Sequence, residues 1–424
     1  MEILPNRLIS WRRDFHRYPE QGFLEMRTAS IVAAELDRLG FELALGQDVM
    51  KKEACMGKPD DALTESHYDW AKENGANEAY LAYFKNGYTG IVATLDTKRP
   101  GPTLAFRFDM DALPITESDA LNHAPKQLGF RSIVEGSMHA CGHDAHTAIG
   151  LGLANMLAKE KDQLNGVMKI IFQPAEEGTR GAKAMVEAGV VDDVDYFIAS
   201  HIGTGVPHRH FVAATNGFMA TTKLNITFSG IASHAGGSPE EGKNALLAAA
   251  NATLNMHAIC RHSAGDSRVH VGELHAGSGR NVVASHAELI AETRGETSEV
   301  NQYMKEQVEN IVAGAASMYG VDYHIKVVGE ALNSICSDDL AETLANIAKE
   351  HPFMEKVVVH DDLSAGSEDA TYFINEVQRQ GGQATYCIFG TELAAGHHHE
   401  CFDIDEASLL PAVEILHAFA KKCK

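Results

Sequence analysis

Residues 103–111, TLAFRFDMD, join a short and mostly apolar run to a pair of acidic side chains. Comparable runs recur along the chain, at 90–95 (GIVATL), 167–172 (VMKIIF), 196–199 (YFIA) and 385–389 (TYCIF). Such runs are typical of strands that are buried on both faces of a sheet. Helical patterns separate them, and this alternation predicts a three-layer α/β fold with a mostly parallel sheet.

The segments around these runs have patterns of their own. Residues 6–39 read as two helices that are broken near Pro19. The last segment of the chain reads as an amphipathic helix, with Asp405 as its expected N-cap. Residues 48–87 differ, because they mix charged, polar and aromatic side chains with little periodicity. We interpret them as a partly helical insertion on the surface.

Residues 218–330 form a separate block in the sequence. Apolar side chains alternate near both of its ends, as in half-exposed strands, and helical and strand patterns follow each other between them. The expected order β-α-β-β-α-β suits a small ferredoxin-like layer. We therefore predict one domain made of residues 1–217 and 331–424, with a second domain inserted into it.

Composition and charge restrict the class of protein. A chain of 424 residues is longer than a single hydrophobic core usually organises, so two domains are expected. The net charge of −22 disfavours nucleic acids and anionic membranes as partners. The sequence contains neither a membrane-span pattern nor the apolar run of a secretory signal, which predicts a cytoplasmic location. Seven irregularly spaced cysteines argue against a disulfide framework.

Side chains that can bind metals cluster where the expected strands end. The clusters are Asp109 and Asp111, Glu176 and Glu177, His201, and the run His397, His398 and His399. Cys141 and His143 stand two residues apart just before an expected helix, flanked by two further histidines and Asp144. Because sites in open α/β sheets form outside the carboxyl ends of the strands, we expect these clusters at one rim.

Each cluster alone has an ordinary interpretation, such as a loop cap, a solvated acid pair or a buried histidine. Cys141 and His143 are the exception, because this spacing is rare outside metal or redox sites. Thiolate, imidazole and carboxylate together suit zinc, manganese, cobalt or nickel better than magnesium or calcium. Five or six ligands exceed the needs of one structural zinc and predict two ions, bridged by Cys141 or by an acid.

Glu176 and Glu177 cannot easily bind the same ion, since adjacent residues at a strand end point in different directions. One of them can bind a metal while the other faces the metal-bound water. The pair therefore predicts one ligand and one general base.

Six longer motifs carry a resemblance to a known family. They are FRFDMDALP (106–114), MHACGHDAHT (138–147), FQPAEEG (172–178), SHIG (200–203), GSED (366–369) and GHHHECFDIDE (396–406). With them the chain resembles the di-metal amidohydrolases of the aminoacylase and glutamate-carboxypeptidase type. Within these it is most similar to the N-acyl amino acid and indoleacetyl-amino acid amidohydrolases, including hippurate hydrolase. The motifs extend over nearly the whole chain.

The resemblance implies a catalytic α/β domain, a lid domain at 218–330 through which the chain forms homodimers, and two divalent metal ions, zinc or manganese. It assigns Glu176 as the catalytic base. The metal ligands that it implies are Cys141, His143, Glu177, His201 and His398. In the last motif the ligand precedes an aromatic residue by four positions, and Phe402 therefore selects His398 over its two neighbours.

The resemblance also assigns residues in the lid domain. His234 resembles the histidine that reaches the site of the partner subunit. Asn281 and Arg294 resemble the residues that hold the carboxylate of the substrate. These motifs are less specific, and a loop histidine and a strand-edge charge are their ordinary interpretations.

Departures from the common pattern narrow the resemblance. Asp109-Met110-Asp111 replaces the His-x-Asp of many relatives, so the two acids are expected to orient the ligands instead of binding the metal. The insertion at 48–87 and the GHHHE run make the chain most similar to the enzymes that hydrolyse p-aminobenzoyl-glutamate to p-aminobenzoate and glutamate.

Two alternatives stay open. One is a broader deacylase of hippurate-like or indoleacetyl substrates. The other is a non-catalytic partner subunit of a hetero-oligomeric hydrolase, with a homologous second subunit. An intact Glu176 speaks against the non-catalytic alternative, because a structural metal site needs no spare base. A redox role for Cys141 is disfavoured, since no second cysteine lies nearby in the sequence.

Overall fold

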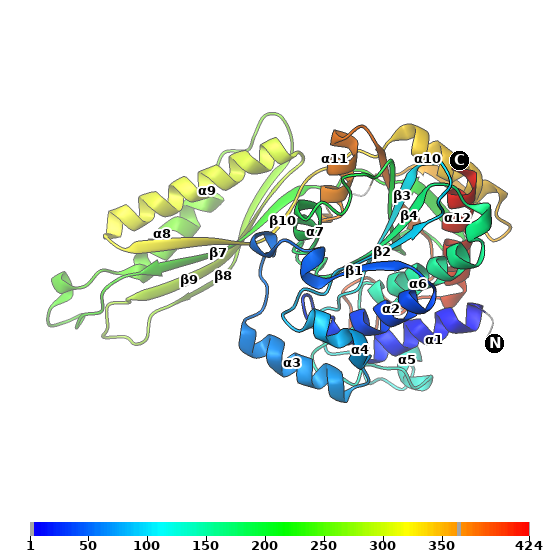
Figure 1. Cartoon of the computed structure of the whole chain (residues 1–424). Coiled ribbons are helices and arrows are strands. Elements are labelled where there is room, and N and C mark those ends of the chain that lie inside the picture. Colours follow the sequence, from blue (N-terminus) through cyan, green and yellow to red (C-terminus); the bar gives the residue numbers. More distant parts are fainter. Residues whose placement is uncertain (1–3, 363–365, 424) are drawn as a thin grey trace. The chain divides into compact units, whose positions relative to one another are not determined.

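The computed structural model describes residues 4–362 and 366–423, and their contacts form two compact units. The first unit holds the residues up to Asn216, a segment that begins at Ser334, and the residues from Asp369 onward. The second holds Gly217–Asn333 and a short segment that ends at Glu368. In Figure 1 the second unit is the green and yellow part that carries α8 and α9.

A sheet of eight strands forms the centre of the first unit. In spatial order they are β1 (Glu42–Leu45), β2 (Ile91–Asp96), β4 (Val167–Gln173), β3 (Thr103–Asp109), β5 (Tyr196–Ile202), β12 (Gln383–Phe389), β6 (His210–Ala214) and β11 (Lys356–His360). The central strands β4, β3, β5 and β12 run parallel to one another, whereas β2 pairs antiparallel with both β4 and β1. The structure confirms the predicted α/β fold with a mostly parallel sheet.

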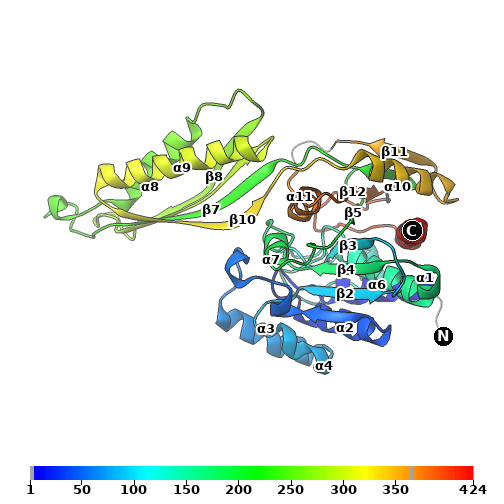
Figure 2. The same cartoon turned by 45° about the horizontal axis from the view of Figure 1, so that its top comes forward.

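Helices cover both faces of this sheet (Figure 2). The helices of this unit are α1 (Leu4–Arg17), α2 (Met26–Arg38), α3 (Asp61–Glu73), α4 (Glu78–Leu81), α5 (Ala124–Gln127), α6 (His143–Lys159), α7 (Ala182–Glu187), α10 (Asp338–Glu350), α11 (Thr371–Arg379) and α12 (Leu409–Lys422). Phe106 of β3 contacts Phe419 of α12, and Phe197 of β5 stacks on Phe373 of α11. Phe106 pairs with Ile198, so Phe106 and Phe197 point to opposite faces. The unit therefore has three layers, as predicted.

Two local expectations had different outcomes. α1 and α2 lie on either side of Pro19, as the pattern predicts. The expected cap of the last helix was wrong. Asp405 accepts the N–H of Ala407 at the start of a short 3-10 helix, Glu406–Ser408, and α12 begins only after it. The chain makes this tighter turn first, so Asp405 caps the turn instead of the helix.

The second unit is an antiparallel sheet with two helices. Its elements follow in the order β7 (Ala220–Ser229), α8 (Ala245–His257), β8 (Ser267–Ala276), β9 (His286–Gly295), α9 (Ser298–Tyr319) and β10 (Asp322–Ala331). The strands lie in the order β10-β7-β9-β8, which confirms the ferredoxin-like arrangement. Alternate side chains of β7, such as Leu224 and Phe228, are buried against the helices, so the helices cover one face. No described helix has the length and apolar character needed to cross a membrane.

Candidate metal centre

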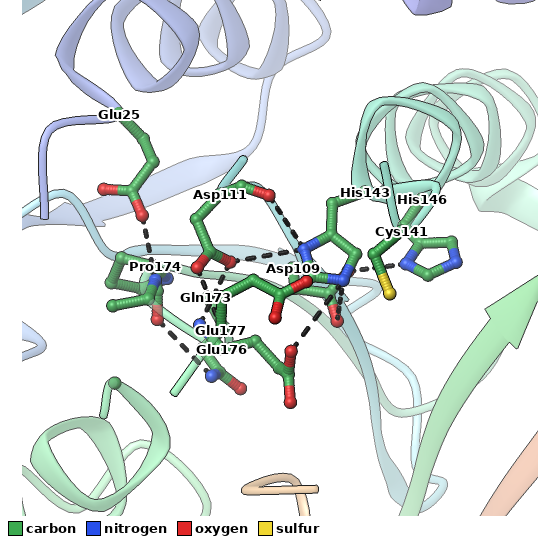
Figure 3. A network of polar contacts seen from close by, with 12 residues as sticks. Glu25, Asp109, Asp111, Cys141, His143, His146, Gln173, Pro174, Glu176 and Glu177 are labelled. Carbon is green, nitrogen blue, oxygen red and sulfur yellow. Dashed lines mark hydrogen bonds and ion pairs between the residues drawn. The ribbon is translucent and has the colours of Figure 1, made fainter. Parts of the chain in front are cut away.

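A sharp turn presents Cys141 and His143 from one short segment. The turn is made by Gly142, whose φ of 91° lies in the left-handed region and which directly precedes α6. Glycine is required there, because an added Cβ would lie 2.8 Å from the Cγ2 atom of Ile202. Cys141 is left just before the helix and His143 in its first turn, and Figure 3 shows their side chains close together.

Two groups of potential ligand atoms share the Cys141 sulfur. Cys141, His143 and His201 place one such atom each within 4.8 Å of the others, and Cys141, Glu177 and His398 do the same. The Cys141 Sγ atom lies 3.5 Å from His201 Nε2, and Glu177 Oε1 lies 3.5 Å from His398 Nε2. All five residues that the sequence singles out are therefore brought together around one sulfur atom.

Burial and charge at this point favour a bound cation. His143 Nε2 and Glu177 Oε1 are buried and have no hydrogen-bond partner in the described part of the chain. Burial, together with the Glu177 carboxylate, raises the pKa of the Cys141 thiol well above its ordinary value. A divalent cation would oppose this shift, because a coordinating thiol loses its proton. Thiol, imidazole and carboxylate donors also suit zinc or manganese, so these residues fit the expected ions.

Asp111 orients the neighbouring groups. The Nδ1 atom of His143 lies 2.9 Å from the Asp111 carbonyl oxygen and 3.3 Å from its carboxylate, so it carries the ring proton. The Nε2 atom, which faces the centre, is then free to bind a metal. The Asp111 carboxylate also accepts the N–H groups of Glu176 and Glu177, at 3.0 and 2.9 Å. This is the orienting arrangement expected for an acid that supports metal ligands.

Asp109 has a different set of partners. Its carboxylate accepts a hydrogen bond from Arg107 at 2.6 Å and lies 2.5 Å from His146 Nδ1. The Nε2 atom of His146 accepts the backbone N–H of Ile202 at 2.9 Å. Both ring nitrogens of His146 are therefore engaged by the protein, and His146 supports the centre without being a candidate ligand.

Glu176 lies beside the ligands instead of completing either three-residue group that shares Cys141. Its Oε2 atom is 3.9 Å from His143 Nε2, which exceeds hydrogen-bonding distance. Glu177, in contrast, belongs to the group with Cys141 and His398. Atoms of His143, Glu176 and Glu177 also lie within 4.8 Å of one another, so both acids are close enough to bind a cation, and the division into one ligand and one general base stays a prediction.

His201 and the histidine run differ from the sequence-based picture in detail. His201 is the penultimate residue of β5 and does not follow the strand, because β5 continues to Ile202. His398 lies close to the shared sulfur and Glu177, and His397 also contacts Cys141, with Nδ1 3.6 Å from the sulfur. Residue spacing alone could not have predicted this second contact.

The candidate residues of the second unit lie in two places. His234 sits in an exposed loop, which is bridged to Val282, and the carbonyl oxygen of Asn281 accepts the N–H of Ala235 at 3.0 Å. The structure thus brings His234 and Asn281 together. Arg294 lies near the far end of β9, where its Nε donates to Glu292 at 2.9 Å. Within this unit, Arg294 therefore does not lie beside His234 and Asn281.

Comparisons with known proteins give consistent results. The sequence pattern of peptidase family M20/M25/M40 matches residues 105–422. Indole-3-acetyl-aspartic acid hydrolase from Enterobacter agglomerans is 53% identical over 98% of this chain and 95% of its own length. A p-aminobenzoyl-glutamate hydrolase subunit from Escherichia coli is 52% identical over 97% of this chain and 95% of its own. The crystal structure of an aminobenzoyl-glutamate utilization protein from Klebsiella pneumoniae is 49% identical, with a TM-score of 0.86 over 99% of this chain and 96% of that one.

Proposed function

Because the chain belongs to peptidase family M20/M25/M40, we propose that it is a metal-dependent hydrolase that cleaves the amide bond of an N-acyl amino acid. The family match confirms the broader resemblance seen in the motifs, and the similarity to the Escherichia and Klebsiella proteins confirms the narrower one. The observation that carries the proposal is the pair of ligand groups that share the Cys141 sulfur, with Glu176 beside them.

The relatives narrow the substrate class. The Enterobacter and Escherichia proteins are named for different acyl groups, indole-3-acetyl and p-aminobenzoyl, yet both names contain an acidic amino acid. We therefore propose an N-acylated glutamate or aspartate, with p-aminobenzoyl-glutamate as the leading substrate. The products would be p-aminobenzoate and glutamate. An indoleacetyl-amino acid or a hippurate-like compound is the alternative.

The residues present account for hydrolysis. Cys141, His143, Glu177, His201 and His398 would hold two divalent ions, zinc or manganese, which lower the pKa of bound water from 15.7 toward about 7. Glu176 takes the proton from the attacking water and passes it to the leaving amine. His234 donates to the developing oxyanion, a contact typically worth about 3–4 kcal/mol. Asn281 and Arg294 hold the substrate carboxylate.

We propose that the first unit is the catalytic domain and the second a lid through which two copies pair. β9 has ten residues, so it extends for roughly 30 Å, and it separates Arg294 from His234 and Asn281. One substrate can meet all three only if they come from different subunits. Exposed leucines on α8, with Leu247 at 45% and Leu254 at 74% accessibility, would be covered in such a homodimer. The cytoplasmic location expected from the sequence stays a prediction.

The test is hydrolysis by the purified chain alone. With added manganese or zinc, we expect release of p-aminobenzoate from p-aminobenzoyl-glutamate, measured beside indoleacetyl-aspartate and hippurate. Glu176→Gln should lower kcat by roughly 10²–10⁴-fold and keep the metal, measured by elemental analysis. Glu73→Gln, on the exposed side of α3, is the control and should behave like the wild type. Normal turnover by Glu176→Gln would refute the base, and no turnover of any substrate would favour the non-catalytic alternative.

A further inference from the structure

The ring of His397 lies beside the shared sulfur and has no role in the hydrolysis described above. We propose that His397 is a positioning residue that donates its Nδ1–H to the Cys141 thiolate and is not itself a metal ligand. This inference rests on the proposed metal centre. It assigns a function to the histidine that directly precedes the expected ligand His398.

Backbone geometry decides which ring nitrogen carries the proton. The Nε2 atom of His397 lies 2.9 Å from the backbone nitrogen of Thr204, whose N–H points at it. A backbone N–H can only donate, so Nε2 must be the unprotonated acceptor. The ring proton therefore sits on Nδ1, which is 3.6 Å from the Cys141 sulfur. His397 faces the sulfur with a donor.

The same geometry separates His397 from its neighbour. His397 offers no free lone pair, because one nitrogen accepts from Thr204 and the other carries the proton. His398 Nε2 instead groups with Cys141 and Glu177 within 4.8 Å. The two histidines keep these separate positions because the His398 N–H donates to the Ala140 carbonyl at 2.8 Å and His398 has a φ of 64°. The loop is thereby anchored to the turn that carries Cys141.

Packing holds the His397 ring in place. Its centroid lies 4.9 Å from that of Phe402 and 5.3 Å from that of His201. A fixed N–H donor stabilises the negative charge of a thiolate and fixes the direction of its lone pairs. A Cys141 thiolate that helped to hold cations would benefit from both effects. Loss of such a supporting partner typically weakens metal binding by roughly 10- to 100-fold.

The test uses the full chain loaded with cobalt(II) in place of the native ions. Cobalt binding is titrated, and the thiolate-to-cobalt charge-transfer band is recorded for each variant. His397→Leu removes the donor, and we expect at least tenfold weaker cobalt binding and a shifted band. His397→Asn places an N–H at the δ position, and we expect it to restore binding to within about threefold of the wild type. His399→Leu is the matched control, since the His399 ring accepts the Cys401 N–H within its own loop.

His397→Gln separates the two contacts of the ring. Glutamine places its amide near the ε position and can keep the contact to Thr204, but it cannot reach the sulfur in the same way. We expect it to behave like His397→Leu. If His397→Gln matched the wild type while His397→Asn was impaired, His397 would act only as an anchor for Thr204, and the proposal would be wrong.

Two further outcomes separate this inference from the function on which it rests. A wild-type protein without a thiolate-to-cobalt band would refute Cys141 as a ligand, and with it the proposed centre. A wild-type band that stays unchanged in His397→Leu would refute the role of His397 alone. Loss of one of two bound cobalt ions in His397→Leu and His397→Asn alike would show that His397 is a ligand, which also overturns the proposal.

Discussion

At the scale of single residues, the backbone that carries Glu176 is held by carboxylates from distant parts of the chain. Ala175 has a φ of 52°, a left-handed conformation that costs a residue with a Cβ on the order of 1 kcal/mol. Glu25 accepts the Ala175 N–H at 2.8 Å and the Thr89 hydroxyl at 2.6 Å. Asp111 accepts the next two N–H groups, as Figure 3 shows. Two buried carboxylates thus fix three successive amides.

We expect Glu25→Ala to lower kcat roughly 10- to 100-fold. The Glu176 side chain would no longer be held in its orientation, whereas the metal ligands would keep their positions. KM and metal content should stay close to wild type. Adding Ala175→Gly should recover part of the loss, since glycine adopts a positive φ without strain. Steady-state kinetics and metal analysis measure both effects.

The matched control for this prediction is Glu20→Gln. Glu20 is another buried acid that accepts two backbone N–H groups, those of Arg27 and Thr28 at the start of α2. Its substitution should lower stability and leave kcat nearly unchanged. Similar losses of kcat in the two variants would mean that Glu25 acts only on stability.

The sequence points to the side chains that converge but not to the groups that support them. Cys141, Glu177 and His398 can be named because their residue types and positions near strand ends carry the chemistry. The role of Glu25 cannot be predicted from the sequence. Its partner is a backbone N–H 150 positions later, which any residue except proline would provide. The proton position on His397 likewise depends on Thr204, which no spacing rule connects to it.

At the scale of elements, α1 joins two of the segments that carry candidate metal ligands, those of His143 and His398. Arg12 is buried and donates to Asp144 in the first turn of α6 and to Asp403 and Glu406 beyond the histidine run. His16, one helical turn later, lies 2.9 Å from the Asp144 carboxylate. One face of a single helix therefore connects the segment of His143 to that of His398.

Arg12→Gln should destabilise the fold by on the order of 3–5 kcal/mol, because buried carboxylates lose their cation. Metal affinity should fall together with stability, since Arg12 holds the segments that carry His143 and His398. Arg13→Gln is the control: Arg13 pairs with Glu406 but is partly exposed, and its loss should cost about 1 kcal/mol or less. Urea unfolding with and without metal measures the difference. Equal midpoints for the two variants would contradict the role of α1.

His16 makes the stability of this connection depend on pH. Burial opposes its charge, but hydrogen bonds to Asp144 and Glu117 outweigh burial and raise the pKa of His16 to about 9. A raised pKa stabilises the fold below the unfolded value of about 6.5, and this stabilisation is lost as pH rises through about 9. Between these pH values the wild type should lose at most about 3 kcal/mol relative to His16→Gln. If the difference in urea midpoint between the wild type and His16→Gln stayed constant across this pH range, the prediction would be wrong.

The central elements of the fold were predictable and its edges were not. β3 and β4 are buried on both faces and therefore show short apolar runs. β11 lies at the edge of the sheet and is only partly buried, and its apolar run is limited to the three valines of KVVVH. α10 is a different case, because Leu340, Leu344 and Ile347 are buried on one face at helical spacing. This spacing is visible in the sequence, yet no helix is predicted there.

At the scale of the whole molecule, the proposed function requires an acidic protein to bind an acidic substrate. The net charge is −22, and a substrate such as p-aminobenzoyl-glutamate adds two carboxylates. Under the proposed function, binding would depend on local cations, namely the two expected metal ions and Arg294. Because His234 and Arg294 lie at opposite ends of β9, one subunit cannot provide both to a single substrate. Each active site should consequently combine two copies of the chain.

Mixing two inactive variants tests this arrangement. His234→Ala lacks the oxyanion donor, and Glu176→Gln lacks the base, so each homodimer should be nearly inactive. In a mixed dimer, the site with the intact Glu176 receives an intact His234 from the other protomer. Random pairing makes about half of the dimers mixed, each with one complete site, so activity should recover to about a quarter of wild type. Light scattering checks the dimer, and differently tagged protomers check the mixing. Mixed dimers that form without any gain in activity would show that His234 serves its own protomer or none.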